Sequence, residues 1–290
     1  MSPDLAPKIS IGPAGWSHPH WDGLFYPAAK PRGFHQLQWI ARHFSTVEIQ
    51  SSFYGPLKPE LSKLWTSLVS KNQDFQFTAR LSRAFTHDRQ LDPAAIALFI
   101  EGLKPLHRAG KLGALLMQFP WGFRYSEDNR NHFLALRRAF HEFPLAAEFR
   151  HDSWMTEEAV GTLIDYRVAF CNVDQAPAPH AMPPTAFLTT GTGYVRLPGR
   201  TENHLYSDSE LLDWKSRIET VARYAKHVHV IFANDAAGRA LANAFQMKSL
   251  FGDSVRIPRE LALRYAVELA HLRPAKPLQT QLFTTELAVA

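Results

Sequence analysis

Residues 46–54 read TVEIQSSFY, and the fold prediction starts from this stretch. Its β-branched residues favour a short strand at 46–50, in which Val47 and Ile49 share one face and Glu48 and Gln50 the other. A carboxylate inside a sheet is costly to bury unless it is paired or belongs to a site. Glu48 therefore indicates either an internal ion pair or a functional site.

On both sides of this strand, short apolar stretches alternate with segments of helical period. The predicted strands are 9–14, 46–50, 75–81, 112–119, 145–150, 168–174, 194–197 and 227–233. Helices are predicted at about 34–44, 59–68, 92–107 and 238–247, and from starts near 126, 156 and 207, where Ser207 and Glu210 form a capping box. Eight strands each followed by a helix predict an α/β fold, a (β/α)8 TIM barrel. A doubly wound open sheet is the competing architecture.

The composition marks no domain boundary in the 290 residues and, with 46% hydrophobic residues, excludes general disorder. We expect a single TIM-barrel domain over residues 9–247, preceded by an N-terminal lead at 1–8. The segment 248–290 is expected to add a C-terminal helical extension, a helix at about 258–272 followed by a tail.

The formal net charge is +5, from 32 basic and 27 acidic residues. This excess mildly favours anionic partners such as phosphates or nucleic acid, but it is far short of a basic arm. The charge alone does not select one class of partner.

Cys171 is the only cysteine, so no intramolecular disulfide can form, and its apolar surroundings favour a packed side chain over a nucleophile. The N-terminus lacks the pattern of a secretion signal, and no apolar stretch is long enough to span a membrane. We expect a cytoplasmic protein without a membrane partner, and the sequence does not define its oligomeric state.

Polar side chains gather at the carboxyl ends of the predicted strands, where barrels of this type carry their active sites. They are Glu48, Gln50, Arg80, Gln118, Glu148, Arg150, Asn172, Asp174, Arg196, Asn234 and Asp235. Core packing alone does not place so many polar groups at equivalent depths, because each must be hydrogen-bonded or paired when it leaves water. We interpret them as a pocket for an anionic ligand, the alternative being a self-satisfied polar ring that closes the barrel.

Roles for these residues follow from their chemistry. The planar guanidinium groups of Arg80, Arg150 and Arg196 suit phosphate or carboxylate oxygens. Glu48, Glu148 and Asp174 are candidates for proton transfer, and two carboxylates on different strands also fit glycoside hydrolysis. His87, just after the third strand, is a candidate base or donor, with a structural loop histidine as the alternative.

His18 and His20 have H-x-H spacing and, with His87 and the three acids, offer ligands for a metal. No second metal motif accompanies them, so no cofactor is predicted and a divalent metal is kept as an alternative. Aromatic residues follow the strands and could stack on a base or sugar, or plug the barrel mouth. They are Trp16, Trp21, Phe25, Tyr26, Phe53, Tyr54, Trp121 and Trp154.

Ordered motifs recur along residues 9–247. They are GPAGW at 12–16, FYP at 25–27, VEIQSSFY at 47–54, FQFTARLSRAFTH at 75–87, LGALLMQFPWGF at 112–123, EFRHDSW at 148–154, YVRLPG at 194–199 and FANDAAGRALANA at 232–244. Together they resemble the YecE-like family, the domain of unknown function numbered 72. The resemblance implies a TIM barrel but no established reaction, and its suggested kinship to apurinic endonuclease-like barrels and to nucleic-acid binders is an analogy of fold.

The resemblance places a set of this chain's residues at recurrent family positions: Trp16, Glu48, Phe53, Tyr54, His87, Gln118, Glu148, Arg150, Trp154, Asp174, Arg196 and Asn234. Three positions depart from it, since the family usually has asparagine at Gln50 and at Asp235 and histidine at Pro198. Pro198 removes a proton carrier and a backbone N–H, which would alter or impair any reaction that uses them.

The sequence thus predicts a TIM-barrel enzyme, a hydrolase or phosphoester-acting protein, with an anionic, phosphate-bearing or nucleic-acid substrate at the barrel mouth. The catalytic candidates are Glu48, Glu148, His87 and Asp174. The substrate-binding candidates are Trp16, Gln50, Tyr54, Arg80, Gln118, Arg150, Trp154, Arg196, Asn234 and Asp235. The alternative is a non-catalytic protein that binds nucleic acid or a metabolite at the same mouth.

Overall fold

The computed structural model describes residues 7–272, and in this part of the chain eight strands form one parallel sheet. They are β1 (Lys8–Pro13), β2 (Thr46–Ile49), β3 (Gln76–Arg80), β4 (Leu112–Gln118), β5 (Leu145–Glu148), β6 (Ala169–Val173), β7 (Thr192–Leu197) and β8 (His227–Phe232). Their order is β1-β8-β7-β6-β5-β4-β3-β2. A bridge between Ala14 and Glu48 joins the two ends of this order, so the sheet is a nearly closed barrel and not an open sheet.

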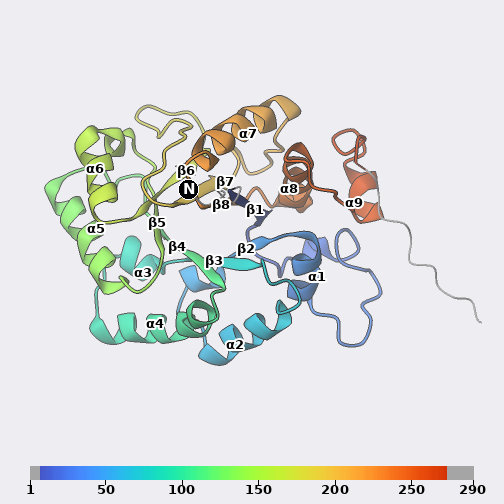
Figure 1. Ribbon diagram of the computed structural model, residues 1–290, viewed down its shortest axis with the longest axis horizontal. Coiled ribbons are helices and arrows are strands. Elements are labelled where there is room, and N and C mark those ends of the chain that lie inside the picture. Colours follow the sequence, from blue (N-terminus) through green and yellow to red (C-terminus); the bar gives the residue numbers. More distant parts are fainter. Residues whose placement is uncertain (1–6, 273–290) are drawn as a thin grey trace, which may run out of the picture.

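Helices surround the sheet (Figure 1). They are α1 (Gln36–His43), α2 (Pro59–Leu68), α3 (Arg83–Thr86), α4 (Pro93–Arg108), α5 (Glu127–Ala139), α6 (Glu157–Asp165), α7 (Asp208–Ala222), α8 (Arg239–Leu250) and α9 (Arg259–Arg264), with single 3-10 turns η1 (Pro19–Trp21), η2 (Ser51–Phe53), η3 (Asp152–Met155) and η4 (Ala236–Gly238). The predicted capping box of Ser207 and Glu210 opens α7. Between residues 7 and 272 no helix has both the length and the apolar character needed to cross a bilayer.

The structure differs from the predicted elements in several places. No helix follows β6, because residues 174–191 form a loop that leads directly to β7, so the prediction of a helix after every strand is wrong at this connection. The short helix α3 was not predicted. Helix α9 ends at Arg264, well before the predicted limit at 272, because Tyr265 leaves the helical conformation (φ −114°, ψ 47°). Strand β5 ends at Glu148 and not at 150, since only Ala146 and Ala147 pair with β6. The tail predicted after residue 272 lies outside the described residues.

Alternate strand residues pack on opposite sides of the sheet, as the period of two requires. Val47 and Ile49 belong to the large core between sheet and helices. The barrel interior holds a second, smaller cluster: Ala14, Ala114, Leu116, Ala146, Ala169, Cys171, Tyr194 and Ile231. Burial raises the pKa of the Cys171 thiol well above its ordinary value, which fits the predicted packed side chain and not the nucleophile.

Two histidines lie on β8 near the amino-terminal end of the barrel. His227 Nε2 is 2.8 Å from the Ser10 hydroxyl, and His229 is only 1% exposed, with no hydrogen-bond partner for Nδ1 in the part of the chain that the structure describes. A Cβ on Gly113 would approach the His229 ring to 2.4 Å, so the glycine makes room for it. Burial lowers the pKa of His227 to about 4 and that of His229 well below its ordinary value.

Because of these two buried imidazoles, we expect the free energy of unfolding to fall in acid. They stay neutral in the folded chain, whereas the unfolded chain takes up protons with pKa values near 6.5. The unfolded state therefore binds more protons below about pH 6.5, and the free energy of unfolding falls as the pH drops from there toward 4. We expect His229→Leu to reduce the loss between pH 7 and pH 4.5 by roughly 1–3 kcal/mol, measured by urea unfolding. Equal losses in the variant and the wild type would contradict this cause.

Candidate functional site at the barrel mouth

A buried ion-pair network crosses the barrel mouth. Arg196 on β7 holds Glu48 on β2 through two bonds, Nε to Oε2 and Nη2 to Oε1, each 3.0 Å long. Its Nη1 lies 3.4 Å from Glu148 Oε2 on β5. The glutamate side chains are 0% exposed and the arginine side chain 6%. The structure thus brings together three of the predicted residues from three separate strands.

The network continues through β4 and β3. Gln118 Nε2 donates to Glu148 Oε1 at 2.7 Å, and Arg80 Nη2 donates to Gln118 Oε1. Arg150 Nε lies 3.5 Å from Glu148 Oε1. The Arg80 guanidinium sits over the Phe53 ring at 3.8 Å, and its buried Nε has no hydrogen-bond partner among the described residues. Two guanidinium groups therefore flank the Gln118–Glu148 pair.

Positive charge is in excess in this network. Arg80, Arg150 and Arg196 carry three positive charges against two negative charges on Glu48 and Glu148, a formal balance of +1. Burial opposes the charge on Arg196, but the two glutamates outweigh it and raise the pKa. Burial, and then the like charge of Arg196, lower the pKa of Arg80. Only the Arg150 side chain, 41% exposed, reaches well into solvent.

Tyr194 is a member of the network that the predictions missed. Its hydroxyl lies 3.2 Å from Glu48 Oε2 and 3.0 Å from Thr78 Oγ1, so it can donate to the carboxylate while accepting from the threonine. Burial raises its pKa well above the ordinary value. The signal in the sequence was its position two residues before Arg196, which puts both side chains on one face of β7.

Asp174 does not converge with the other acids as predicted. Its Oδ1 accepts from Arg200 Nε at 3.1 Å, and Arg200 Nη1 lies 3.1 Å from Glu210 Oε1. Within the described residues it makes no hydrogen bond or ion pair with the side chain of Arg196, which holds both Glu48 and Glu148. Asp174 therefore belongs to a separate ion pair, whose partner comes from the loop between β7 and α7.

Two other predicted ligand contacts point away from the mouth. Trp154 is 0% exposed, stacks on Phe149 at 3.8 Å between ring centroids and donates to the Phe123 carbonyl. It therefore packs in the outer core and cannot stack on a ligand in this conformation. Asn234 Nδ2 donates to Asn243 Oδ1 of α8 at 2.9 Å and so fixes the loop after β8. Tyr54 lies at the surface, with 78% of its side chain exposed.

His87 directly follows α3 and lies beside Phe53, the ring over which the Arg80 guanidinium sits. Its ring meets the Phe53 ring edge to face at 5.4 Å, and Nδ1 is 2.9 Å from Thr86 Oγ1. Burial, followed by the nearby charges of Arg83 and Arg80, lowers its pKa, so the imidazole is neutral at pH 7. A neutral imidazole next to a cationic group is able to accept a proton.

A cavity of about 260 Å³ opens beside the mouth. It is lined by Gly15, Trp16, Ser17, His18, Gln50, Ser51 and Trp65. Trp16 and Gln50 thus line a cavity, as predicted for ligand contacts, and Trp16 is braced edge to face by Trp65 at 5.0 Å. Another cavity of about 260 Å³, between α1 and the end of α2, is lined by none of the strand-end residues and has no connection to this chemistry.

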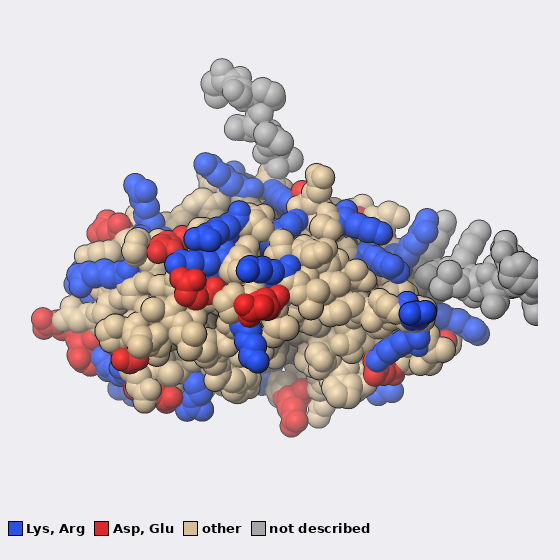
Figure 2. Space-filling view, turned by 90° about the horizontal axis from the view of Figure 1, so that it is seen from below, with Lys and Arg blue, Asp and Glu red and all other residues tan. Residues whose placement is uncertain are grey.

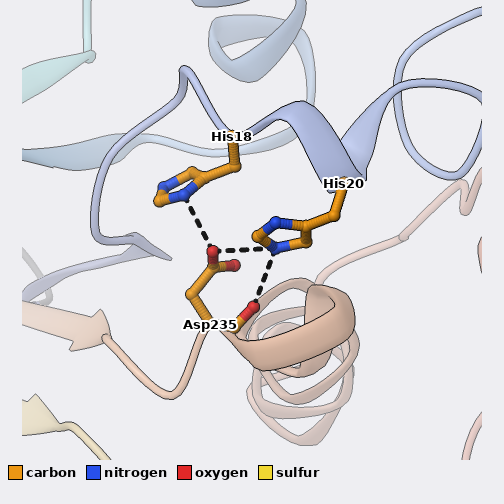
Figure 3. Close-up of side chains that lie close together, drawn as sticks. All are labelled: His18, His20 and Asp235. Atoms are coloured by element: carbon orange, nitrogen blue, oxygen red, sulfur yellow. Dashed lines mark hydrogen bonds and ion pairs between the residues drawn. The ribbon is translucent and has the colours of Figure 1, made fainter.

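The H-x-H pair meets a different acid from those predicted. Figure 3 shows His18 and His20 pointing at Asp235, with His18 Nδ1 and His20 Nε2 at 2.9 and 3.0 Å from Asp235 Oδ2. Their ligand atoms lie within 4.8 Å of one another, whereas His87, Glu48, Glu148 and Asp174 join no such group in the described residues. The H-x-H motif is local, so it gives no sign of Asp235, which lies far along the chain.

Comparison with known proteins gives consistent results. The family model described as "Protein of unknown function DUF72" matches residues 10–265. The chain is similar to the UPF0759 protein YunF of Bacillus subtilis, with 26% identity over 88% of this chain and 99% of that protein. The UPF0759 protein YecE of Escherichia coli is 30% identical over 40% of this chain and 39% of its own.

Solved structures show the same architecture. A DUF72 family protein from Thermotoga maritima superposes with a TM-score of 0.74 and 26% identity, covering 85% of this chain and all of the other. A DUF72 family protein from Enterococcus faecalis gives a TM-score of 0.75 with 23% identity, covering 85% of this chain and 96% of the other. These likenesses agree with the predicted barrel.

Proposed function

Because the chain belongs to the DUF72 family of proteins of unknown function, its reaction has to be argued from the barrel mouth, and we propose that it is a hydrolase of a small phosphate-bearing substrate. One observation carries the proposal: three guanidinium groups meet only two carboxylates at the mouth. An anionic ligand would balance the remaining charge.

Arg80 and Arg150 are the groups proposed to hold the anion. The N–H groups of Arg196 already donate to Glu48 and Glu148, so we assign Arg196 to holding these two acids in position. Among the described residues, the buried Nε of Arg80 has no hydrogen-bond partner, and the side chain of the partly exposed Arg150 makes only one long polar contact, 3.5 Å, to Glu148. Phosphate oxygens can accept from both without breaking the Arg196 pairs.

The proposed hydrolysis needs a base near this anion site. His87 is neutral at pH 7 and lies beside the Phe53 platform of Arg80, where it could take a proton from an attacking water. Glu148 is the carboxylate next to Arg150 and the proposed partner in proton transfer. The water's oxygen would form the new bond to phosphorus as His87 takes its proton, the bond between phosphorus and the ester oxygen would break, and the protonated His87 would then give that proton to the leaving ester oxygen.

A non-catalytic binder is the second candidate, and one observation favours it. Glu48 and Glu148 are 0% exposed, and both are already bound to Arg196. This arrangement resembles the self-satisfied polar ring considered above, in which the acids serve structure and only the arginine rim meets a ligand.

The charge on one outer face favours a small ligand over nucleic acid. Figure 2 shows the outer face over α2 and α4, where Lys and Arg side chains are spread with Asp and Glu among them. A strand of nucleic acid would be better served by one continuous basic groove.

The anion site predicts a specific loss of binding. We expect Arg150→Ala to weaken inorganic phosphate binding about 10-fold to 100-fold, because a charge-assisted hydrogen bond contributes about 1.5–3 kcal/mol. Isothermal titration calorimetry measures this change. Arg83→Ala is the matched control, since Arg83 is 56% exposed and already faces Asp88. Equal affinities in wild type and Arg150→Ala would contradict the assignment.

Turnover separates the enzyme from the binder. In a screen of aryl phosphoesters, Glu148→Gln should abolish turnover yet leave phosphate binding nearly intact. A wild-type chain that binds phosphate but is silent across the screen would favour the binder. Activity on aryl glycosides would contradict the phosphoester proposal and indicate a sugar substrate. Tight oligonucleotide binding whose affinity falls steeply as the salt concentration rises would indicate a nucleic-acid ligand.

A further inference from the structure

His18, His20 and Asp235 come together because β1 and β8 are neighbours in the barrel. His18 precedes η1 and His20 lies within it, just after β1, and Asp235 begins η4, just after β8. Figure 3 shows the two rings converging on one carboxylate from the same side. The three ligand atoms are contributed by two loops that the parallel pairing of β1 and β8 holds in register.

The His18 ring is oriented so that Nδ1 faces the carboxylate. Its Nε2 lies 3.1 Å from the Ala14 carbonyl, which can only accept, so Nε2 carries a proton. The neutral ring then presents the Nδ1 lone pair to Asp235 Oδ2 at 2.9 Å. Two lone pairs at that distance repel unless a proton or a cation lies between them. A metal-binding histidine is typically held in this way, with its other nitrogen donating to a backbone carbonyl.

The Asp235 carboxylate is held so that one of its oxygens, Oδ2, is free to face the two histidines. Trp21 Nε1 donates to Asp235 Oδ1 at 2.8 Å, which leaves Oδ2 for the two histidines. His20 Nε2 lies 3.0 Å from both Asp235 Oδ2 and the Asp235 carbonyl oxygen, so without an ion it carries the proton that these oxygens accept. In the other tautomer, with the proton on Nδ1, the Nε2 lone pair faces Asp235 Oδ2, and a cation takes the place of the proton.

We propose that His18 Nδ1, His20 Nε2 and Asp235 Oδ2 bind one divalent transition-metal ion of the zinc or cobalt type. Two imidazoles and one carboxylate are ligands that these ions prefer, and they leave an open coordination position for water. Metal–ligand bonds of about 2.0–2.1 Å require tetrahedral ligands about 3.3 Å apart. The contacts of His18 and His20 to Asp235 Oδ2, 2.9 and 3.0 Å, need to widen by a few tenths of an ångström, and the two ring nitrogens, which lie within 4.8 Å of each other, need to reach the same spacing.

The surroundings allow an ion to enter. The side chains of His18, His20 and Asp235 are 21%, 43% and 14% exposed. His20 also borders a cavity of about 390 Å³ with Asp22 and Arg264, among others. The proposed site does not depend on the anion site at the mouth.

A second group, His151, Asp152 and His180, is a weaker candidate and a useful comparison. His151 Nδ1 already accepts from the Ser153 backbone N–H at 3.2 Å, so its lone pair is engaged. The His180 side chain is 69% exposed and lies 3.3 Å from Asp152. Unlike the Nδ1 lone pair of His18, that of His151 is therefore not free to face the carboxylate of its own group.

The test is titration of the full chain, stripped with a chelator, with zinc(II) by calorimetry and with cobalt(II) by visible absorption. The wild type should bind one equivalent and show the absorption bands of a low-coordinate cobalt site. His18→Ala, His20→Ala and Asp235→Asn should each weaken binding by at least about 100-fold, since losing a ligand costs more than losing its supporting hydrogen bond. His180→Ala should bind as the wild type does.

The variants also control for folding. Asp235→Asn keeps an oxygen to accept from Trp21, and His20 is largely at the surface, so thermal melting should show folded proteins. Absence of binding by the wild type, or wild-type affinity in His20→Ala or Asp235→Asn, would overturn the proposal. Loss of binding in His180→Ala alone would move the site to the second group and overturn it equally.

Discussion

Replacing Arg196 by Met is expected to lower the free energy of unfolding by about 3–5 kcal/mol. The guanidinium makes two 3.0 Å bonds to Glu48 and a 3.4 Å contact to Glu148, and both carboxylates are 0% exposed. Without it, the interior retains two negative charges that have lost their main counter-charge. Urea unfolding at pH 7 measures the change.

The expected cause is the unpaired charge and not the lost volume. Removing one of the two carboxylates as well, in Glu48→Gln/Arg196→Met, should recover part of the loss, because an amide is less costly to bury than a carboxylate. Arg83→Met is the matched control and should change stability by less than about 1 kcal/mol, since its partner Asp88 is at the surface. A loss as small as that of Arg83→Met would show that the network does not stabilise the fold.

Replacing Gly12 by Ala is expected to lower the free energy of unfolding by about 3 kcal/mol or more, beyond the usual range for overpacking. A Cβ at this position would lie 1.9 Å from the Thr46 carbonyl oxygen and 2.8 Å from the Thr46 carbonyl carbon. These are backbone atoms of β2, so the strand would have to move. The barrel is closed at this seam by the single Ala14–Glu48 bridge, and displacement of β2 would open it.

Gly161→Ala is the matched control for this substitution. Gly161 lies inside α6, and a Cβ there would meet nothing within 4 Å. The exchange should stabilise the chain by about 0.5–1 kcal/mol, as expected for glycine to alanine in a helix. Thermal and urea unfolding of both variants provide the comparison. Wild-type stability in Gly12→Ala would mean that β1 and β2 are not held as closely as the structure shows.

The fold was open to prediction from the sequence because its signals are local. The alternation in TVEIQ predicts an outward face for Val47 and Ile49 and an inward one for Glu48, and the structure has this arrangement. The Ser207 capping box predicts the start of α7 for the same reason, since all of its atoms lie within four residues. The resemblance to the YecE-like family adds agreement that does not depend on these patterns, and the family match confirms it.

The candidate site was predicted only as a set of strand ends. Parity and position along each strand identify Glu48, Glu148, Arg196 and Gln118, and these four meet. The same reasoning placed Asp174 with them, but a loop arginine, Arg200, holds it elsewhere. Trp154 was expected at the mouth, yet the aromatic stack with Phe149 draws it into the outer core.

The sequence by itself determined the eight strands, the helices that follow seven of them, the inward face of each strand and the excess of basic over acidic groups, since these depend on residues close together in the chain. Only the tertiary structure decided the partners: Arg196 for Glu48, 148 residues apart, and Asp235 for His18 and His20, more than 200 residues apart. Such pairs arise because barrel closure brings β1 beside both β2 and β8. The partner of a side chain at the barrel mouth depends on the strand register and on the path of the loops, and no local sequence pattern predicts either of them.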